Sequence, residues 1–326
     1  MGNEDTHSTA ANYRRFARLE AHGRSPLYEH LTEAVSEDPE LLGLLASLPA
    51  PKRQPNLLLG VVQYLYGTVA DYPAFRRLVV ERWSDVSSTM LVRRTQTNEV
   101  GRCATLLPLL AELPQPLALL EVGASAGLCL LLDRYGYDYG RGVIGQANSA
   151  VVLRCEYRGS SSPAPTMLPE VAWRAGVDLD PVDVRDESAT RWLEALVWPG
   201  EGDRLSRLRA AIEVARQDPP RVLEGDLRAD LREVISGVPS GSTLVVFHSA
   251  VLAYVPARDR ETFAADLARL GAVWIANEGA RVLPTVQGRL SAAEVDANEA
   301  HFILSQDGCP VAWADPHGSW FQRCDG

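Results

Sequence analysis

The pattern of apolar and polar positions divides the stretch from Leu117 to Tyr137 into three successive segments. Leu117 to Val122 is an apolar run that carries one acidic residue, Glu121, near its end, which is typical of a buried parallel strand. Gly123 to Gly127 contains only small residues, as a tight turn requires where the backbone approaches a ligand and a helix packs on the strand. Leu128 to Arg134 then predicts the first turns of an amphipathic helix. Parallel α/β sheets begin a nucleotide-type pocket in this way, and Glu121 lies where their ligand crevice forms.

The residues before this strand have helical spacing. Two helices are predicted in the stretch that follows Ser25, separated at Asp38-Pro39, where Asp38 can cap the second one. Further helices are predicted from Gln54-Pro55 and from Tyr72-Pro73. The pattern therefore predicts a helical amino-terminal region over residues 1–115, acting as a lid or as an independent domain, followed by an α/β domain over residues 116–326.

Polar residues are concentrated in the segment that leads into the last of these helices, where seven positions contain Gln96, Thr97, Asn98, Glu99 and Arg102. Thr97 or Asn98 could cap the helix, and Glu99 is favourable near its positive end. Capping requires neither a second amide nor an arginine one turn later. We therefore also consider a polar ligand clamp made of Gln96, Asn98, Glu99 and Arg102.

The second half of the chain contains further strand patterns. Residues 137–172 predict an inserted β-hairpin followed by a flexible connection. Later apolar runs end at Asp226, at His248-Ser249 and at Asn277-Glu278, and the last segments predict antiparallel strands joined at a turn, Asp307-Gly308. The fold class expected is α/β, with a mostly parallel, Rossmann-like sheet and antiparallel strands at the carboxyl end.

Composition narrows the classes of partner and location. The formal net charge is −10 and the pI is about 5.2, which argues against nucleic acid because binding a polyanion requires a basic face. No apolar run reaches the roughly 18 residues of a membrane span, and the amino terminus lacks the apolar core of a signal peptide. Five cysteines without C-x-x-C spacing favour reduced thiols, so we expect a cytoplasmic protein. Neither an H-x-x-x-H nor an H-E-x-x-H pattern is present, so no metal is expected.

The order Glu121, Gly123, Ser125, Gly127 resembles the E/D-x-G-x-G-x-G signature of class I S-adenosylmethionine (SAM) dependent methyltransferases, with Ser125 at the middle glycine. A dinucleotide site requires G-x-G-x-x-G instead. The resemblance implies SAM as the cofactor, with this turn and Glu121 against its amino-acid moiety. It also implies that Asp226 accepts a hydrogen bond from the adenine amine and that Leu227 covers the ring, although Asp226 is equally suited to capping a helix.

The resemblance to methyltransferases also implies an acidic residue at the end of the second strand, where a carboxylate with two acceptor oxygens accepts hydrogen bonds from both ribose hydroxyls. Asp178 lies 57 residues after Glu121, or 21 when the 36 residues of the predicted insertion are set aside. That interval is close to the expected separation of about 20. If the second strand is VVLRCEY, the ribose ligand is Glu156 instead.

Candidate chemistry lies at the ends of the later strands. His248 could act as the catalytic base because the unperturbed pKa of histidine is near 6.5, or it could be structural. Ser249 and Tyr254 could orient a substrate, and Asn277 and Glu278 could bind it or close a turn. Ser249 lacks the G-x-S-x-G context of a hydrolase nucleophile. His317 is expected to be structural.

The chain as a whole resembles the uncharacterised family named domain of unknown function two-three-three-two, which is grouped with class I methyltransferase-like folds. The resemblance runs from about Tyr13 to Trp320 and rests on the segments SPLYEHL, RQPNLLLGVVQYL, QTNEVGRCATLLP, LEVGASAGLCLLLDRYGYDYG, RWLEALVWP, VVFHSAVLAYVP, WIANEG and WADPHGSW. This resemblance supports the fold. Together with the glycine turn and the strand-end residues, it leads to the hypothesis of a SAM-dependent methyltransferase that acts on a small polar molecule, with the helical amino-terminal region covering the substrate. The alternatives are a non-catalytic protein that binds SAM or another small ligand, and a scaffold whose helical region binds a protein.

Overall fold

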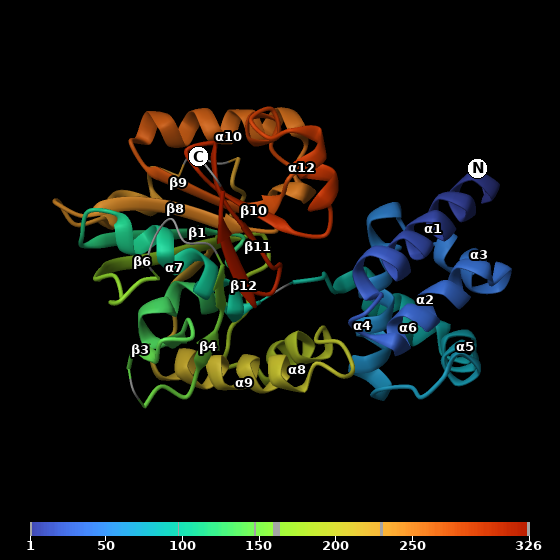
Figure 1. Cartoon of the computed structure of the whole chain (residues 1–326). Helices are drawn as coiled ribbons and strands as arrows, with labels where there is room; N and C mark the ends of the chain where they lie inside the picture. The colour runs from blue at the N-terminus through green and yellow to red at the C-terminus, as the bar shows by residue number, and fades with distance from the viewer. Residues whose placement is uncertain (1, 97, 147, 159–163, 229–230, 325–326) are drawn as a thin grey trace. The chain divides into compact units, whose positions relative to one another are not determined.

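The computed structural model of the chain describes residues 2–96, 98–146, 148–158, 164–228 and 231–324. It divides into two compact units. We call them the helical unit (Met1–Thr97 with Glu187–Ser206) and the sheet unit (Asn98–Asp186 with Arg207–Gly326). The helical unit therefore takes a segment from the second half of the chain (Figure 1).

The helical unit contains α1 (Gly2–Phe16), the π-helical η1 (Ala17–Ala21), α2 (Pro26–Glu37), α3 (Pro39–Ala46), the 3-10 turn η2 (Ala50–Lys52), α4 (Pro55–Tyr66), α5 (Tyr72–Glu81), α6 (Trp83–Val92), α8 (Glu187–Ala195) and the start of α9 (Gly202–Gln217). The starts of α2, α3 and α5 combine a proline in the first turn with a polar cap. Ser25 caps α2, and Asp38 caps α3 as predicted, accepting hydrogen bonds from the amides of Glu40 (2.9 Å) and Leu41 (3.1 Å). A side chain at Gly60 would lie 2.8 Å from Leu196, the residue after α8, and 3.4 Å from Trp192 of α8, so α4 and this segment pack closely there.

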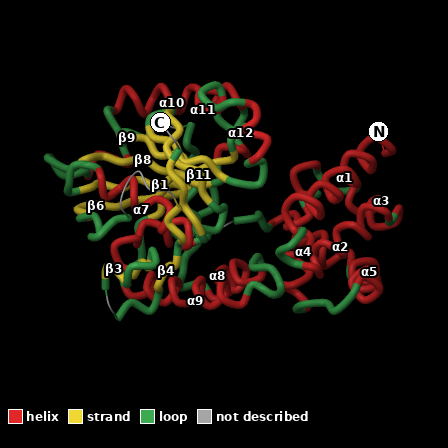
Figure 2. The backbone as a smooth tube through the Cα atoms, in the orientation of Figure 1, coloured by secondary structure: helices red, strands yellow, loops and turns green. Residues whose placement is uncertain are grey.

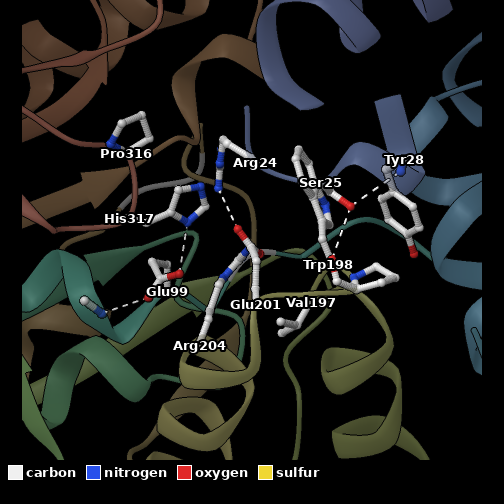
Figure 3. A network of polar contacts seen from close by, with 12 residues as sticks. Arg24, Ser25, Tyr28, Glu99, Val197, Trp198, Glu201, Arg204, Pro316 and His317 are labelled. Atoms are coloured by element: carbon white, nitrogen blue, oxygen red, sulfur yellow. Dashed lines mark hydrogen bonds and ion pairs between the residues drawn. The ribbon is translucent and has the colours of Figure 1, made fainter. Parts of the chain in front are cut away.

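The polar contacts of the helical unit fix the segment around α8 to the amino-terminal helices (Figure 3). Arg24 forms an ion pair of 3.0 Å with Glu201, and Ser25 Oγ donates to the carbonyl oxygen of Pro199 at 3.2 Å. Because these partners are far apart in the sequence, they hold α8 in the unit together with the apolar contacts of Trp192 and Trp198.

The sheet unit is a mixed α/β structure with a large, mostly parallel sheet, in agreement with the expected class (Figure 2). Its helices and turns are η3 (Val100–Arg102), α7 (Cys103–Glu112), η4 (Leu128–Arg134), the rest of α9, η5 (Val234–Gly237), η6 (Leu252–Tyr254), α10 (Ala257–Leu270), α11 (Pro284–Gln287) and α12 (Ala292–Ala297). Its strands are β1 (Leu117–Val122), β2 (Gly136–Asp138), β3 (Val143–Gly145), β4 (Val152–Arg154), β5 (Glu156–Arg158), β6 (Val171–Asp178), β7 (Val222–Glu224), β8 (Thr243–Ser249), β9 (Val273–Gly279), β10 (Phe302–Gln306), β11 (Cys309–Ala314) and β12 (Trp320–Arg323).

Nine strands form the large sheet in the order β5-β12-β11-β10-β9-β8-β1-β6-β7. The five strands from β7 to β9 are parallel, and their spatial order shows that the chain builds outward from β1 on one side and then returns to β8 on the other. The order therefore reverses between β1 and β8. In open α/β sheets, ligands bind in the crevice outside the carboxyl ends of the strands at such a point.

The two faces of β1 have different neighbours. Leu120 and Val122 pack with Phe263 and Leu267 of α10, so α10 covers their face. Side chains alternate along a strand, so Glu121 lies on the opposite face.

The segment after the glycine turn differs from the prediction. The amphipathic α-helix expected at Leu128–Arg134 was wrong, because η4 is 3-10 helix with a non-helical residue, Leu131, inside it. Its residues from Leu128 to Leu132 are all buried and leave no polar face. Side chains replace the amide donors of an α-helix: Tyr135 Oη donates to the Leu128 carbonyl at 2.7 Å, Tyr137 Oη to that of Leu132 at 2.6 Å, and Arg174 Nη1 to that of Leu130 at 2.8 Å.

The region predicted as an inserted hairpin contains a third strand in addition to the two strands of the hairpin. β2 and β3 are antiparallel, and β4 pairs in parallel with the other edge of β2 to form a three-stranded sheet. β5 then pairs with β12 at the edge of the large sheet. The predicted flexible connection includes residues 159–163, which lie outside the described residues. At the carboxyl end, β10, β11 and β12 are antiparallel, and Asp307-Gly308 forms the predicted turn with positive φ at both residues.

Candidate functional site

The loop between β1 and η4 is held by hydrogen bonds from all five of its backbone amides. Gly123 N and Ala124 N donate to the Val177 carbonyl at 2.8 and 3.3 Å, and Gly127 N donates to the Ala124 carbonyl at 2.7 Å. Ser125 N donates to Asp178 Oδ2 at 2.8 Å, and Ala126 N donates to Asn98 Oδ1 at 3.0 Å. The loop therefore presents its amides to the protein, and none of them is left to bind an anion.

Three residues of this loop have positive φ: Gly123 (72°), Ser125 (50°) and Gly127 (66°). Side chains at the two glycines would also meet protein atoms, because a Cβ at Gly123 would lie 2.3 Å from Val251 and one at Gly127 would lie 2.7 Å from Pro220. Ser125 takes the left-handed conformation although it is not glycine, which costs about 1–3 kcal/mol. Its conformation is held by the bonds from its amide to Asp178 and from Asn98 Nδ2 to its Oγ (2.8 Å).

Glu121 is a buried carboxyl group without a hydrogen-bond partner among the described residues. Its side chain lies between Gly176 of β6 and Phe247 of β8 in the strand register. The residue is 7% exposed, and its Oε2 is buried and unpartnered. Burial raises the pKa of Glu121 well above its usual range, the Cys129 thiol and the Asp178 carboxylate add to the effect, and Arg102 opposes it. A buried polar group without a partner is costly, so this position is a strong candidate for ligand contact.

Asp178 ends β6, which is the strand that pairs with β1 on the side away from β8. Its Oδ2 accepts the Ser125 amide, and its Oδ1 accepts the Asp180 amide at 2.9 Å. A carboxylate has about four acceptor positions, so both oxygens keep capacity for a ligand. Glu156, the alternative, begins β5 at the far edge of the sheet and pairs with Arg158 at 2.7 Å. The second strand beside β1 is thus the one that contains Asp178.

The polar segment before α7 connects the loops around the site. Asn98 uses both ends of its amide on the loop after β1, as described above. Glu99 is buried, with Oε1 accepting from the Gly101 amide (3.0 Å) and from Arg207 (3.1 Å). Arg102 is 5% exposed and donates to the carbonyl oxygens of Pro316 (2.8 Å) and Ser249 (3.2 Å). These three side chains hold protein loops in place.

The other members of that segment lie elsewhere. Gln96 belongs to the helical unit, and Thr97, one of the two predicted caps, lies outside the described residues. α7 begins only at Cys103, after the turn η3, and Glu99 is the cap of that turn.

The carboxyl-terminal loop joins the site through His317 (Figure 3). His317 Nδ1 lies 3.0 Å from Glu99 Oε2, a contact that is consistent with the structural role expected for this histidine. The two backbones touch, because a Cβ at Gly101 would lie 2.1 Å from the His317 carbonyl oxygen and one at Gly318 would lie 2.0 Å from that of Gly101. Sequence reasoning missed Arg207, Pro316 and the glycine pair. The segment WADPHGSW, with its Asp-Pro and His-Gly steps, was the available signal for a turn.

His248 has neither an exposed surface nor an open ring nitrogen. Its Nδ1 is 2.7 Å from Glu278 Oε1, and its Nε2 accepts a hydrogen bond from the Trp274 indole at 2.9 Å. An indole N–H only donates, so Nε2 carries no proton and Nδ1 is the donor. His248 lies on the α10 face, where Phe263 and Trp274 enclose it, on the opposite side from Glu121. This geometry offers no base to a ligand beside Glu121.

The remaining strand-end residues divide between the two faces. Asn277 lies in register with Ser249, and its Nδ2 donates to Ser249 Oγ at 3.0 Å, while its buried Oδ1 has no hydrogen-bond partner in the described part of the chain. Glu278 is on the His248 side, where Oε1 also accepts the amides of Val251 (2.9 Å) and Leu252 (3.0 Å). Tyr254, in η6, is 74% exposed. Ser249 and Asn277 thus share a face with Glu121, and Glu278 does not.

Asp226 and Leu227, which follow β7, contact nearby residues in the described part of the chain. Asp226 forms an ion pair with Arg228 and accepts its amide at 2.9 Å, and the Arg228 side chain lowers the pKa of Asp226. Leu227 is half-buried against the apolar cluster that includes Leu231. The helix that Asp226 could cap contains residues 229 and 230, which lie outside the described residues.

The comparisons with known proteins identify the family. Residues 10–323 match the model of the family described as "Uncharacterized protein conserved in bacteria (DUF2332)", so the chain belongs to that family. Neither a search of curated proteins nor a search of solved structures gave a match. In the described part of the chain, no helix is long and apolar enough to cross a membrane, and no three His, Cys, Asp or Glu side chains converge on a metal position.

Proposed function

We propose that the sheet unit binds SAM and that the protein is a SAM-dependent methyltransferase acting on a small polar molecule. The observation that carries the proposal is the buried Oε2 of Glu121, which has no hydrogen-bond partner within the described ranges. It stands at the end of β1, beside the point where the strand order reverses, and such a position is where α/β sheets bind ligands. A cationic amino group would supply the missing partner and stabilise the charged carboxylate.

The loop favours SAM over a dinucleotide. Dinucleotide sites direct the amides of a glycine turn and of an α-helix start at a pyrophosphate. Here all five amides of Gly123–Gly127 donate within the protein, and 3-10 helix follows them. SAM contains no phosphate, so it does not require free amides at this loop.

The parts of the proposed site have distinct tasks. Glu121 binds the amino group of the cofactor, and Asp178 accepts hydrogen bonds from the ribose hydroxyls with the capacity that remains on its oxygens. Asp226 and Leu227 are proposed to contact the adenine. Asn98 and Arg102 are positioning residues, because they hold the loops on which the ligand groups stand.

The methyl acceptor is proposed to lie against Ser249 and Asn277. The buried Oδ1 of Asn277 has no partner among the residues that the structure describes, and in this proposal it accepts a hydrogen bond from an N–H or O–H group of the substrate. SAM, when bound, supplies an already activated methyl group, so the residues mainly align donor and acceptor. His248 has no part in this proposal, because both of its ring nitrogens are occupied.

A second candidate is a protein that binds SAM or a related ligand without transferring a methyl group. The burial of His248 favours this second candidate, because the proposed site lacks the catalytic base that the sequence suggested. The test is methyl transfer from methyl-tritiated SAM to a fractionated extract of small polar molecules, with the Asp178→Asn variant as the control. Labelled product formed by the wild type and not by the variant supports the enzyme. Binding of S-adenosylhomocysteine without any labelled product supports the second candidate, and the absence of both removes the two proposals.

A further inference from the structure

The helical unit carries a cluster of basic and aromatic side chains that has no part in the proposed cofactor site. The guanidinium carbon of Arg93 lies 5.1 Å from the centre of the Tyr64 ring and 5.6 Å from that of Trp192. Nη2 of Arg93 donates to Tyr64 Oη (3.2 Å) and to Ser188 Oγ (3.0 Å). From α8, the guanidinium of Arg191 covers the Tyr64 ring at 4.6 Å. Two cations therefore lie around one pair of hydroxyl groups.

The backbone that carries Arg93 is fixed from two sides. Lys52 Nζ donates to the Arg93 carbonyl oxygen at 2.7 Å, and the Trp192 indole donates to that of Arg94 at 2.9 Å. A guanidinium that is already stacked and hydrogen-bonded loses little further freedom when a ligand binds.

Neither guanidinium is neutralised by an acid. Among the described residues, Arg93 and Arg191 form no ion pair, although the chain has 42 acidic residues against 32 basic ones. Glu187, one turn before Arg191 on α8, does not pair with it in the described part of the chain. Hydrogen bonds from Ser188, Arg191 and Arg93 lower the pKa of the Tyr64 phenol, as a positive local field does. The Nε and Nη1 donors of Arg93 keep capacity for an oxyanion.

We propose that Arg93, Arg191, Tyr64 and Ser188 form a binding site for a dianionic phosphate group. Two guanidiniums, that of Arg93 held by hydrogen bonds and that of Arg191 stacked over the Tyr64 ring, match a dianion in charge, and planar guanidiniums bind phosphate oxygens in pairs. The hydroxyl groups of Tyr64 and Ser188 lie 2.9 Å apart, so one donates to the other and the remaining O–H supplies one further donor. The ligand is free phosphate or the phosphate of a small monoester.

Calorimetric titration of the full chain with inorganic phosphate, at constant ionic strength set by chloride, tests the site. We expect one saturable site, with affinity reduced at least about tenfold in Arg93→Gln and in Arg191→Gln. Arg77→Gln is the matched control, since Arg77 is an exposed arginine of α5 in the same unit. Arg93→Lys keeps the positive charge but lacks the planar, forked donors of arginine. Weaker phosphate binding by this variant, with an unchanged circular dichroism spectrum, would show that the loss is of binding and not of folding.

Phenyl phosphate and acetate complete the experiment. Tighter binding of phenyl phosphate points to a monoester as the ligand, and tighter binding of inorganic phosphate points to the free ion. The proposal is overturned if phosphate gives no saturable heat, if acetate binds as tightly as phosphate, or if both glutamine variants bind phosphate like Arg77→Gln. None of these results depends on SAM, so failure here leaves the proposed function standing.

Discussion

The carboxylate of Asp178 holds the backbone of Ser125: its Oδ2 accepts the Ser125 amide at 2.8 Å. This bond joins the end of β6 to the loop after β1 and stabilises a serine in the left-handed conformation, at φ 50°. The residue proposed to bind the ribose therefore also shapes the loop that packs against the rest of the cofactor.

Asp178→Asn is expected to weaken both ligand binding and the loop. The amide side chain has one acceptor oxygen in place of two, so either the Ser125 or the Asp180 amide loses its partner, at a cost of about 1–3 kcal/mol in the free energy of unfolding. We expect affinity for S-adenosylhomocysteine to fall at least about tenfold, measured by calorimetry beside urea unfolding. Asp183→Asn is the control, because Asp183 is exposed and accepts only a local amide, that of Arg185. Equal affinity in the two variants would remove Asp178 from the ligand site.

Glu121 makes binding and stability depend on pH. Because burial raises the pKa of this carboxyl group in the folded state, the folded protein binds more protons than the unfolded one above the usual glutamate pKa. The stability that Glu121 contributes therefore falls as the pH rises from the pKa of this group in the unfolded chain towards its higher pKa in the folded protein. Glu121→Gln is expected to raise the melting temperature more at pH 8 than at pH 5, which thermal unfolding across this range measures.

The same carboxyl group must ionise to pair with a cationic amino group, so binding of S-adenosylhomocysteine should release a proton and tighten with rising pH. Calorimetry in buffers of different ionisation enthalpy measures the proton. Glu121→Gln should release none and bind at least about tenfold more weakly. Proton release that is unchanged in Glu121→Gln would show that another group ionises.

Asn98 is expected to act through the loop. Asn98→Ala leaves the Ala126 amide and Ser125 Oγ without their partner, which should cost about 1–3 kcal/mol and speed hydrogen exchange at residues 123–127. Urea unfolding and amide exchange measure the two effects. Asn298→Ala is the matched control, since Asn298 is a half-buried asparagine that caps the end of α12, away from this loop in the sequence. If loop exchange in Asn98→Ala equals that of the control, the clamp on the loop is not what stabilises it.

His248 is expected to matter for folding alone. In His248→Phe, Glu278 loses its ring donor and the Trp274 indole loses its acceptor in a fully buried place, at a cost of roughly 2–4 kcal/mol. Affinity for S-adenosylhomocysteine should stay within about twofold of the wild type. The comparison variant is His30→Asn, at an exposed position of α2. A stable His248→Phe protein with lost ligand affinity would return His248 to the site.

Much of the sheet could be predicted from local pattern. The apolar run of β1, the acidic residue at its end and the strand that ends at Asp178 follow from periodicity and interval, because buried parallel strands are continuous apolar segments. The small sheet and the pairing of β5 with β12 could not, since they depend on which edges remain open after the rest has folded.

The side-chain network of the site lay beyond local reasoning. Arg174 of β6 donates to the carbonyl oxygen of Leu130 in η4, a contact between distant segments that the local pattern does not reveal. Polarity marked Asn98, Glu99 and Arg102 as important, but only the folded chain shows that their partners are loops of the protein. For His248, the sequence around the strand end is the same whether the side chain faces a ligand or the helix α10, so the sequence alone does not distinguish the two.

The central claim is that the carboxyl ends of β1 and β6 bind SAM. The most direct measurement is calorimetric titration of the wild type, Glu121→Gln and Asp178→Asn with S-adenosylhomocysteine, with the dinucleotide NAD as the competing ligand class. The account predicts micromolar, one-to-one binding of S-adenosylhomocysteine by the wild type, at least about tenfold weaker binding by each variant, and no binding of NAD. Binding of NAD, or no binding of S-adenosylhomocysteine by a folded wild-type protein, would contradict it.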